Sequence, residues 1–548
     1  MTDVARATAG LWSYGSADGY YDEARTPDGR VRPHWHELLG AIEAFGPREA
    51  ERRWQQGRRL LRENGVTYNV YGDPRGIDRL WEIDPLPLVI PAAEWQLIEA
   101  AVAQRAKLLN RILADVYGPQ QLMADDLLPP ELVFGQPAFL RPCHGIDVPG
   151  DTFLHIYAAD LGRSVDGRWW VIADRTQAPA GVGYALENRM VLRRTLPDLF
   201  RASRVRRHAA FFEAYRDMLG ALAPGRESPR VVLLTSGPYN ETYFEHSYLA
   251  RHLGIALVEG GDLAVRDERV YLKTLTGLLR VDVILRRQDD VFCDPLELYD
   301  KSTLGVPGLL QAVRAGHVTV ANALGSGVTE SAAMMAFHQA LCPKLLGEPL
   351  MLPSIATWWC GQDEPRANVL ANLDRLVIKP TFPSRGGEPI FGARLDAAGR
   401  ADLTRRIEAA PDEFVAQEQL SLSVAPVWSG DGFAPRHITM RVYAVAVRGT
   451  YKVLPGGLTR VSIADDSLVV SMQHGGGSKD TWVLGDDGRD AAIVRRAESR
   501  AIVVNRGDAA LSSRVADNLF WLGRYLERVD FQARLCRAVF TGLSDGPS

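Results

Sequence analysis

The sequence lacks several patterns that define common functional classes. Its five cysteines are scattered and form no CxxC pair, which argues against a zinc ribbon or a disulfide framework and fits a reducing cytoplasm. No uncharged apolar run reaches the roughly 18 residues of a membrane span, and the N-terminus has no apolar stretch long enough for a signal peptide. The net charge of −4 suggests no basic stripe for nucleic acid, and the Walker A pattern is absent. We therefore expect a cytoplasmic protein that binds neither nucleic acid nor membrane.

The 548 residues are too many for one ordinary core, and changes of pattern divide them into five segments. The first segment has helical spacing, and the second contains a long amphipathic helix followed by a strand hairpin. The third segment alternates short strands with helices, which is typical of a parallel α/β sheet. Strands dominate the fourth segment, and one amphipathic helix forms the fifth. The expected domains are residues 1–85, 86–227, 228–345, 346–485 and 511–548.

The stretch VIKPTFPSRGGEPIFGA (377–393) ends a β-branched strand with a lysine and continues into a glycine loop. The ammonium of Lys379 can point at a nucleotide phosphate, and Gly386 and Gly387 let backbone N–H groups approach the same oxygens. An ordinary lysine at the edge of a sheet, beside a common turn, is the alternative interpretation.

About forty residues later, EFVAQEQL (413–420) reads as an extended strand. Its backbone could meet the edge of an adenine, and the carboxylate of Glu418 could accept a hydrogen bond from a ribose hydroxyl. Half-buried strands of this kind are common, so the alternative interpretation is an ordinary strand that binds no nucleotide.

Three cations follow on strands and glycine turns. Arg441 lies inside a strand, where an inward guanidinium is costly without an anionic partner, Arg460 follows a GGLT turn, and Lys479 follows three glycines. Together they predict a clamp for phosphate and acyl phosphate. Surface cations are the alternative.

An acidic element lies far upstream, in YAADLGRSVDGRWWVIADRTQAPAGVGYALENR. Carboxylate and amide oxygens suit Mg²⁺, and no histidine or cysteine in this cluster suggests zinc or iron. The candidate metal ligands are Asp160, Asp174, Glu187 and Asn188. A solvated hairpin with ordinary turn acids is the alternative.

Several other stretches favour structural interpretations. The two histidines of HWH (34–36) have no third ligand nearby, and no cysteine has a histidine placed as a base. The glycine loops 235–246 and 321–331 could contact a substrate, but simple strand-to-helix connections explain them.

The chain resembles a circularly permuted ATP-grasp protein, related in architecture to glutathionylspermidine synthetase, over roughly residues 65–482. The segments that carry the resemblance are ADRTQAPAGVGYALENR, LGSGVTES, VIKP and GGLTRV…QHGGGSKDTW. It implies an α+β and α/β fold in which ATP lies between two subdomains, with a pre-ATP-grasp-like parallel domain and with ATP and Mg²⁺ as cofactors. Lys379 would contact the phosphates, Gly386 and Gly387 would lie in the flap, and Gln417, Glu418 and Leu420 would lie at the adenine.

Two departures from this pattern stand out. Where relatives of glutathionylspermidine synthetase carry a Glu-x-Asn triplet, this chain reads Ala173-Asp174-Arg175, which puts the metal set in question. The flap also has fewer glycines than is usual, so side chains such as Arg385 would carry more of the phosphate binding.

The tail SRVADNLFWLGRYLERVDFQARL resembles the opening helix of an α-E helical domain, as in a fusion cut short. Its apolar face leads us to expect self-association or a helical partner through residues 512–540.

The resemblance implies an ADP-forming carbon–nitrogen ligase. It would join a small-molecule or peptide carboxylate to an amine through an acyl phosphate. A degenerate ATP-grasp scaffold that binds a nucleotide or a partner without catalysis is one alternative, and phosphoryl transfer to a hydroxyl is a weaker one.

Overall fold

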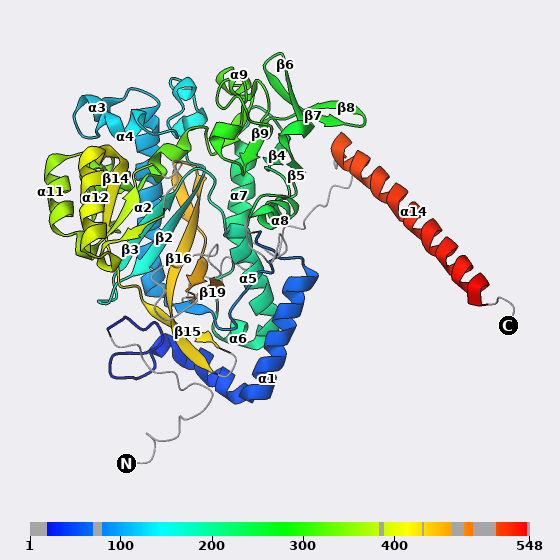
Figure 1. The fold of residues 1–548 in the computed structure, drawn as a ribbon, viewed down its shortest axis with the longest axis horizontal. Helices are drawn as coiled ribbons and strands as arrows, with labels where there is room; N and C mark the ends of the chain where they lie inside the picture. The colour runs from blue at the N-terminus through cyan, green and yellow to red at the C-terminus, as the bar shows by residue number, and fades with distance from the viewer. Residues whose placement is uncertain are drawn as a thin grey trace, which may run out of the picture.

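The computed structural model describes residues 19–69, 79–382, 388–429, 432–462, 476–485 and 511–544. An eight-stranded sheet forms its centre (Figure 1). The strands are β1 (Leu88–Ile90), β2 (Ile156–Arg163), β3 (Trp169–Arg175), β15 (Val424–Trp428), β16 (Phe433–Val447), β17 (Thr450–Val453), β18 (Leu458–Val461) and β19 (Gly477–Val483). Their order is β1-β19-β18-β16-β2-β3, and β15 and β17 pair with opposite ends of β16. The predicted hairpin of β2 and β3 is confirmed, and it lies beside a strand from the distant C-terminal part of the chain.

Helices cover both faces of this central sheet. On one face lies α2 (Ala92–Val116), which packs against β16 and β17; on the other lies α5 (Val182–Thr195), which packs against β18 and β19. The buried residues of α2 recur at helical spacing and form the apolar stripe that the sequence predicts. The N-terminal helical sequence forms α1 (His36–Glu63), which bends at Gly46 (φ 68°) and packs against α5.

A smaller sheet in the order β10-β9-β4-β5 confirms the predicted parallel α/β segment. It consists of β4 (Val231–Leu234), β5 (Ala256–Val258), β9 (Val283–Arg286) and β10 (Thr319–Ala321), with α8 (Tyr243–Leu253) and α9 (Leu309–Arg314). Between β5 and β9 the chain forms an antiparallel sheet that the sequence analysis did not predict. Its strands are β6 (Leu263–Arg266), β7 (Arg269–Thr274) and β8 (Gly277–Arg280). Helix α7 (Ala209–Ala221) contacts both β9 and the central β16 (Figure 1).

A third unit lies beside the central sheet and has its own small hydrophobic core. Its sheet has the order β11-β14-β12-β13, with strands β11 (Thr357–Trp359), β12 (Leu376–Pro380), β13 (Ile390–Phe391) and β14 (Phe414–Glu418). Helices α11 (Asp363–Ala371) and α12 (Ala397–Ala409) cover it. Residues 419–423 lead directly from β14 to β15, so one short connection joins this small sheet to the central one.

The remaining helices are short connectors, except the last. They are α3 (Gln121–Ala124), α4 (Pro130–Phe134), α6 (Pro197–Ala202) and α10 (His338–Leu346). The last helix, α14 (Ser513–Ser544), confirms the predicted C-terminal helix and projects away from the body (Figure 1). Its large apolar side chains are open to solvent; Phe520 is 63% exposed and Trp521 is 44% exposed. Within the described parts of the chain, no helix is long and apolar enough to cross a membrane.

Candidate functional site

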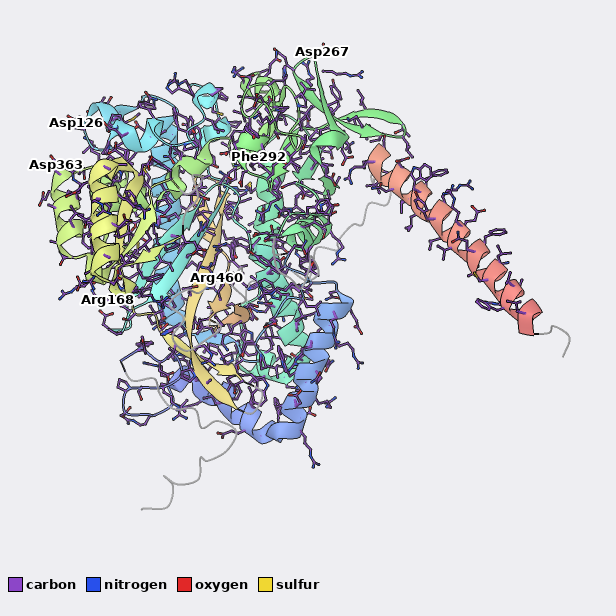
Figure 2. The ribbon with its side chains drawn as sticks, viewed as in Figure 1. Asp126, Arg168, Asp267, Phe292, Asp363 and Arg460 are labelled. Atoms are coloured by element: carbon purple, nitrogen blue, oxygen red, sulfur yellow. The ribbon has the colours of Figure 1, made fainter. Side chains whose placement is uncertain are left out.

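A cluster of arginines surrounds one buried carboxylate at the middle of the central sheet. Asp160 of β2 lies opposite Arg441 of β16, whose Nε and Nη2 donate to the two carboxylate oxygens at 2.7 and 2.9 Å. Arg460 of β18 reaches Oδ1 at 2.9 Å, and Arg175 of β3 reaches Oδ2 at 3.4 Å. Burial raises the pKa of Asp160, but Arg441 and Arg460 outweigh that effect and hold the pKa well below its usual range. Figure 2 places Arg460 at the centre of the body.

Lys379 approaches this cluster from the small sheet. Its Nζ donates to Oε1 of Gln417 at 2.6 Å, since β12 and β14 pair in antiparallel register. Burial, together with the positive charge of Arg175, lowers the pKa of Lys379 to about 8, although Asp160 acts in the opposite direction. These influences show that the two sheets bring the lysine close to the arginines. Four cations thus lie close to the ion-paired Asp160, so the junction of the sheets is positively charged and suited to an anion.

Two further acids lie near the cluster, and the sequence analysis missed both. Oε1 of Glu330 accepts hydrogen bonds from the backbone N–H groups of Thr176 and Gln177, at 2.6 and 2.7 Å. Burial raises the pKa of Glu330, while Arg175 lowers it and Asp289 raises it further. The pKa of Asp289 is also raised, by desolvation and by the charge of Asp290, although Asp289 is exposed to solvent. Asp289 follows shortly after β9, at the carboxyl edge of a parallel sheet, and that position is the signal that could have revealed it.

The residues predicted for the nucleotide base lie in and beyond β14. Gln417 is buried and faces Lys379, and Glu418 ends the strand with an exposed side chain. Leu420 packs on Gly162 of β2, where a Cβ atom would lie 2.9 Å from Leu420 Cδ2. The predicted flap residues Arg385, Gly386 and Gly387 lie outside the residues that the structure describes.

The third predicted member of the cationic clamp does not join the other two. Lys479 pairs with Thr459, and the next pair along is Ser478 with Arg460, so Lys479 points to the opposite face of the sheet from Arg460. Its Nζ donates to Asp84 Oδ1 at 2.6 Å and to two backbone carbonyls. The side chain is fully buried, and burial lowers its pKa although Asp84 opposes the shift. Lys479 therefore does not join Arg441 and Arg460, and a phosphate clamp made of these two arginines stays a prediction.

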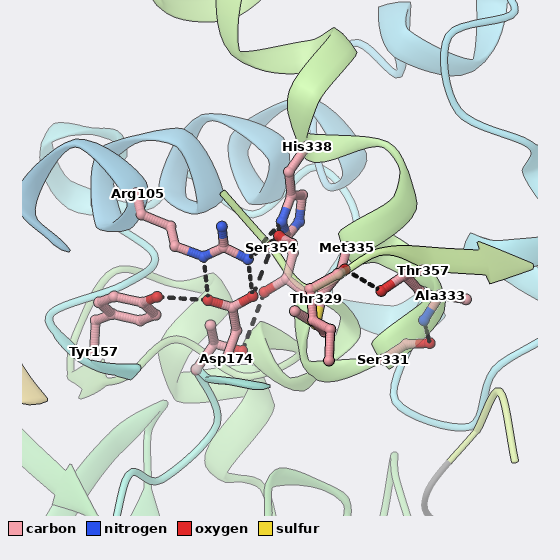
Figure 3. Close-up of polar contacts among 12 residues, drawn as sticks. Arg105, Tyr157, Asp174, Thr329, Ser331, Ala333, Met335, His338, Ser354 and Thr357 are labelled. Carbon is pink, nitrogen blue, oxygen red and sulfur yellow. Dashed lines mark hydrogen bonds and ion pairs between the residues drawn. The ribbon is translucent and has the colours of Figure 1, made fainter. Parts of the chain in front are cut away.

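Asp174 also turns away from the arginine cluster. In the hairpin it pairs with Ala159, while Asp160 pairs with Ala173, so the two aspartates face opposite sides. Figure 3 shows Asp174 between Arg105 of α2, which donates to both oxygens at 2.7 Å, and the hydroxyl of Tyr157 at 2.5 Å. Both charged groups are buried, which makes this ion pair part of the packing between α2 and the sheet.

Glu187 and Asn188, the other two predicted metal ligands, lie on α5 and bind protein groups. The Asn64 side chain donates to Glu187 at 2.5 Å, and Trp81 Nε1 donates to Asn188 Oδ1 at 2.9 Å. The four predicted ligands therefore do not meet at one point. Across the ranges that the structure describes, no group of three or more histidine, cysteine, aspartate or glutamate side chains is arranged to hold a metal ion.

Comparisons with known proteins agree with this architecture. Residues 87–462 match the family described as circularly permuted ATP-grasp type 2. Residues 511–547 match Alpha-E, an alpha-helical domain with a conserved ER motif, and Glu527-Arg528 of α14 supplies that dipeptide.

Two relatives are similar over most of this chain. An uncharacterized protein of Mycobacterium tuberculosis is 39% identical over 544 residues, which are 97% of this chain and 61% of the relative. An uncharacterized protein of Synechocystis is 38% identical over 466 residues, which are 85% of this chain and 97% of the relative. The chain thus spans about three fifths of the length of the mycobacterial relative.

One solved structure has a similar fold. It is a glutathione synthetase-like effector from Globodera pallida, with 12% identity and a TM-score of 0.50, and the match covers 79% of this chain and 96% of that one. At this identity the likeness concerns the fold alone. The match over residues 87–462, together with the central and small sheets, shows that this chain belongs to the circularly permuted ATP-grasp type 2 family.

Proposed function

We propose that this protein is an ATP- and Mg²⁺-dependent ligase that joins a carboxylate to an amine through an acyl phosphate. Membership of the ATP-grasp family suggests ATP-dependent ligase activity in general. The observation that supports the proposal for this chain is the junction of the two sheets, where Arg175, Arg441 and Arg460 pair with Asp160 and Lys379 lies within electrostatic range of Arg175 and Asp160. Such an excess of buried positive charge favours a polyanion.

In this proposal Lys379 binds the phosphates of ATP, and Gln417 holds its ammonium in place. The end of β14, from Gln417 through Glu418 to Leu420, would meet the nucleotide base and ribose. Arg385, Gly386 and Gly387 remain the proposed flap.

The implied magnesium ion fits a different set of residues from the one that the sequence suggested. Asp160 is satisfied by arginines, and Asp174, Glu187 and Asn188 bind other protein groups. Burial and the charge of Asp289 raise the pKa of Glu330, and desolvation and Asp290 raise the pKa of Asp289. A bound cation would oppose these shifts. Mg²⁺ often uses only one or two carboxylates together with water and phosphate oxygens. Glu330 and Asp289 would hold the ion, which would neutralise phosphate charge.

The proposed reaction has two displacements. A carboxylate oxygen of the substrate attacks the γ-phosphorus, the bond to the β-phosphate oxygen breaks, and ADP leaves. The nitrogen of the amine then attacks the acyl carbon, phosphate leaves with the bonding pair, and the amine loses a proton. Arg441 and Arg460 would bind the oxygens on which negative charge grows, and Lys379 would hold the transferred phosphoryl group.

Hydroxylamine tests this proposal because it traps acyl phosphates as hydroxamates. With Mg²⁺, ATP and a mixture of carboxylic acids, the protein should release ADP and form a hydroxamate in equal amounts. Tight ATP binding with no ADP release in any mixture would favour the non-catalytic scaffold instead. A stable phosphate ester in place of the hydroxamate would favour transfer to a hydroxyl.

The pKa of Lys379 predicts a pH dependence for nucleotide binding. Because this pKa is about 8, below the usual 10.5, the free protein loses the positive charge of Lys379 as the pH rises above 8. The dissociation constant for ATP should therefore rise by up to about tenfold per pH unit between pH 8 and 10. Equilibrium titration with a fluorescent ATP analogue measures this change.

A matched variant separates this effect from others. Lys379→Arg keeps its charge throughout this range, so its dissociation constant should stay flat with pH. A flat profile in the wild-type protein would remove Lys379 from the phosphate site.

A further inference from the structure

A large pocket lies beyond the arginine cluster and is not used by the proposed chemistry. Its volume is about 820 Å³. It opens between the second half of α1, residues 80–85, and the neighbouring ends of β15, β16, β18 and β19. A cavity of this size can accept a small-molecule or short peptide ligand.

The wall of the pocket is positively charged. Arg58 and Arg62 are one turn apart on α1, exposed, and without an acidic side chain within ion-pairing distance in the described parts of the chain. Arg436 of β16 adds a third guanidinium. Of the two acids in the wall, Asp84 is already bound to Lys479 and to two backbone N–H groups, which leaves Glu82 alone against the arginines.

Aromatic surface complements this charge. Trp54 and Trp428 are partly exposed in the wall, and the guanidinium of Arg58 lies 5.3 Å from the ring of Trp54. A smaller apolar cavity shares Trp54 and Trp428 with the pocket. The pocket therefore offers an apolar surface beside cations, which suits a ligand with both anionic and apolar groups.

The pocket adjoins the proposed reaction centre. Ser478 of β19, in its wall, pairs directly with Arg460 of β18, so both face the same side of the sheet. Trp81 in its wall lies 6.1 Å from the ring of Tyr68, and both Arg441 and Arg460 act electrostatically on Tyr68. A ligand could extend from the pocket to the arginine cluster.

We infer that this pocket binds the distal part of the acceptor substrate, and that this substrate is a peptide-like molecule with two or more carboxylates and an apolar side chain. One carboxylate reaches Arg441 and Arg460 and is activated. Another binds Arg58 and Arg62, and the apolar group packs on Trp54 and Trp428. The inference rests on the proposed ligase function and gives its substrate class.

The test uses the full chain and the acetylated tripeptide Phe-Glu-Glu as the probe. Calorimetry in the presence of Mg²⁺ and a non-hydrolysable ATP analogue should detect its binding to the wild-type protein. The double variant Arg58→Glu/Arg62→Glu should weaken binding by about tenfold or more, because two ion pairs become repulsions. Arg59→Glu reverses an exposed charge of the same helix outside the pocket, so it should change the dissociation constant by less than about twofold.

The outcomes separate this inference from the proposed function. Equal weakening by Arg59→Glu and by the double variant would show only a general charge effect and would overturn the inference, as would no binding of the peptide at millimolar concentration. Neither result bears on whether the protein binds ATP. If the ATP analogue itself fails to bind the wild-type protein, the proposed function falls, whatever the peptide does.

Discussion

Replacing Lys379 with methionine should reduce ATP turnover by at least about a hundredfold, because the phosphoryl group loses the cation that holds it. The fold should survive. Since burial lowers the pKa of Lys379 to about 8, the buried ammonium destabilises the folded state below pH 8, and this cost fades as the pH approaches the unfolded value of 10.5. The variant should therefore melt at or above the wild-type temperature at pH 7. The difference between the two melting temperatures should be smaller at pH 10. Phosphate release and thermal melting measure the two effects.

A lysine elsewhere on a strand provides the control. Lys452 of β17 is exposed and pairs with Val445, four residues along β16 from Arg441, so Lys452→Met should leave both turnover and melting temperature close to those of the wild type. If Lys379→Met turns over ATP at the wild-type rate, this lysine has no part in the chemistry.

Replacing Asp160 with asparagine should destabilise the protein by about 3–5 kcal/mol, because Arg441 and Arg460 then lie in a largely buried site without their counter-ion, beside the more exposed Arg175. The direction of the pH dependence follows from the pKa of Asp160, which is far below its usual value in the folded state. The stabilisation is therefore complete above the unfolded pKa and is lost as the pH falls below it. Urea unfolding at pH 7 measures the difference.

An added anion should reveal where the lost charge lay. Sulfate or ATP binding among the uncompensated arginines should stabilise Asp160→Asn more than the wild type. Asp166→Asn, in the exposed turn between β2 and β3, should cost less than about 0.5 kcal/mol and show no such response. An Asp160→Asn protein as stable as the wild type would show that the arginines do not depend on this carboxylate.

Strand patterns predicted the hairpin of β2 and β3 and the parallel segment, and both are confirmed. That Lys379 and the arginines bind the phosphates of one ATP stays a prediction. The position of Arg441 inside a strand correctly required an anionic partner. The partner present in the folded chain is Asp160, and a sequence pattern does not reveal whether that role falls to a side chain or to a ligand.

The predicted metal ligands Asp160 and Asp174 lie on opposite faces of the hairpin for a specific reason. The register of β2 and β3 shifts between Asp160 and Leu161, so β3 contains one extra residue at Ile172. Without this bulge Asp174 would lie on the same face as Asp160. Because of the bulge, the side chain of Asp174 points to α2 and Arg105. The alternation of apolar and polar residues in the sequence does not reveal a bulge of this kind.

The pairing of β2 with β16 also governs how the chain can fold. Arg441 lies 281 residues after its partner Asp160, so the middle of the central sheet stays incomplete until β16 has left the ribosome. Contacts of such long range slow folding and leave strand edges exposed to aggregation. A nascent chain that ends before β16 leaves Asp160 with Arg175 but without Arg441 and Arg460. Chaperones that shield sheet edges should therefore matter more for this protein than for one whose strands pair in chain order.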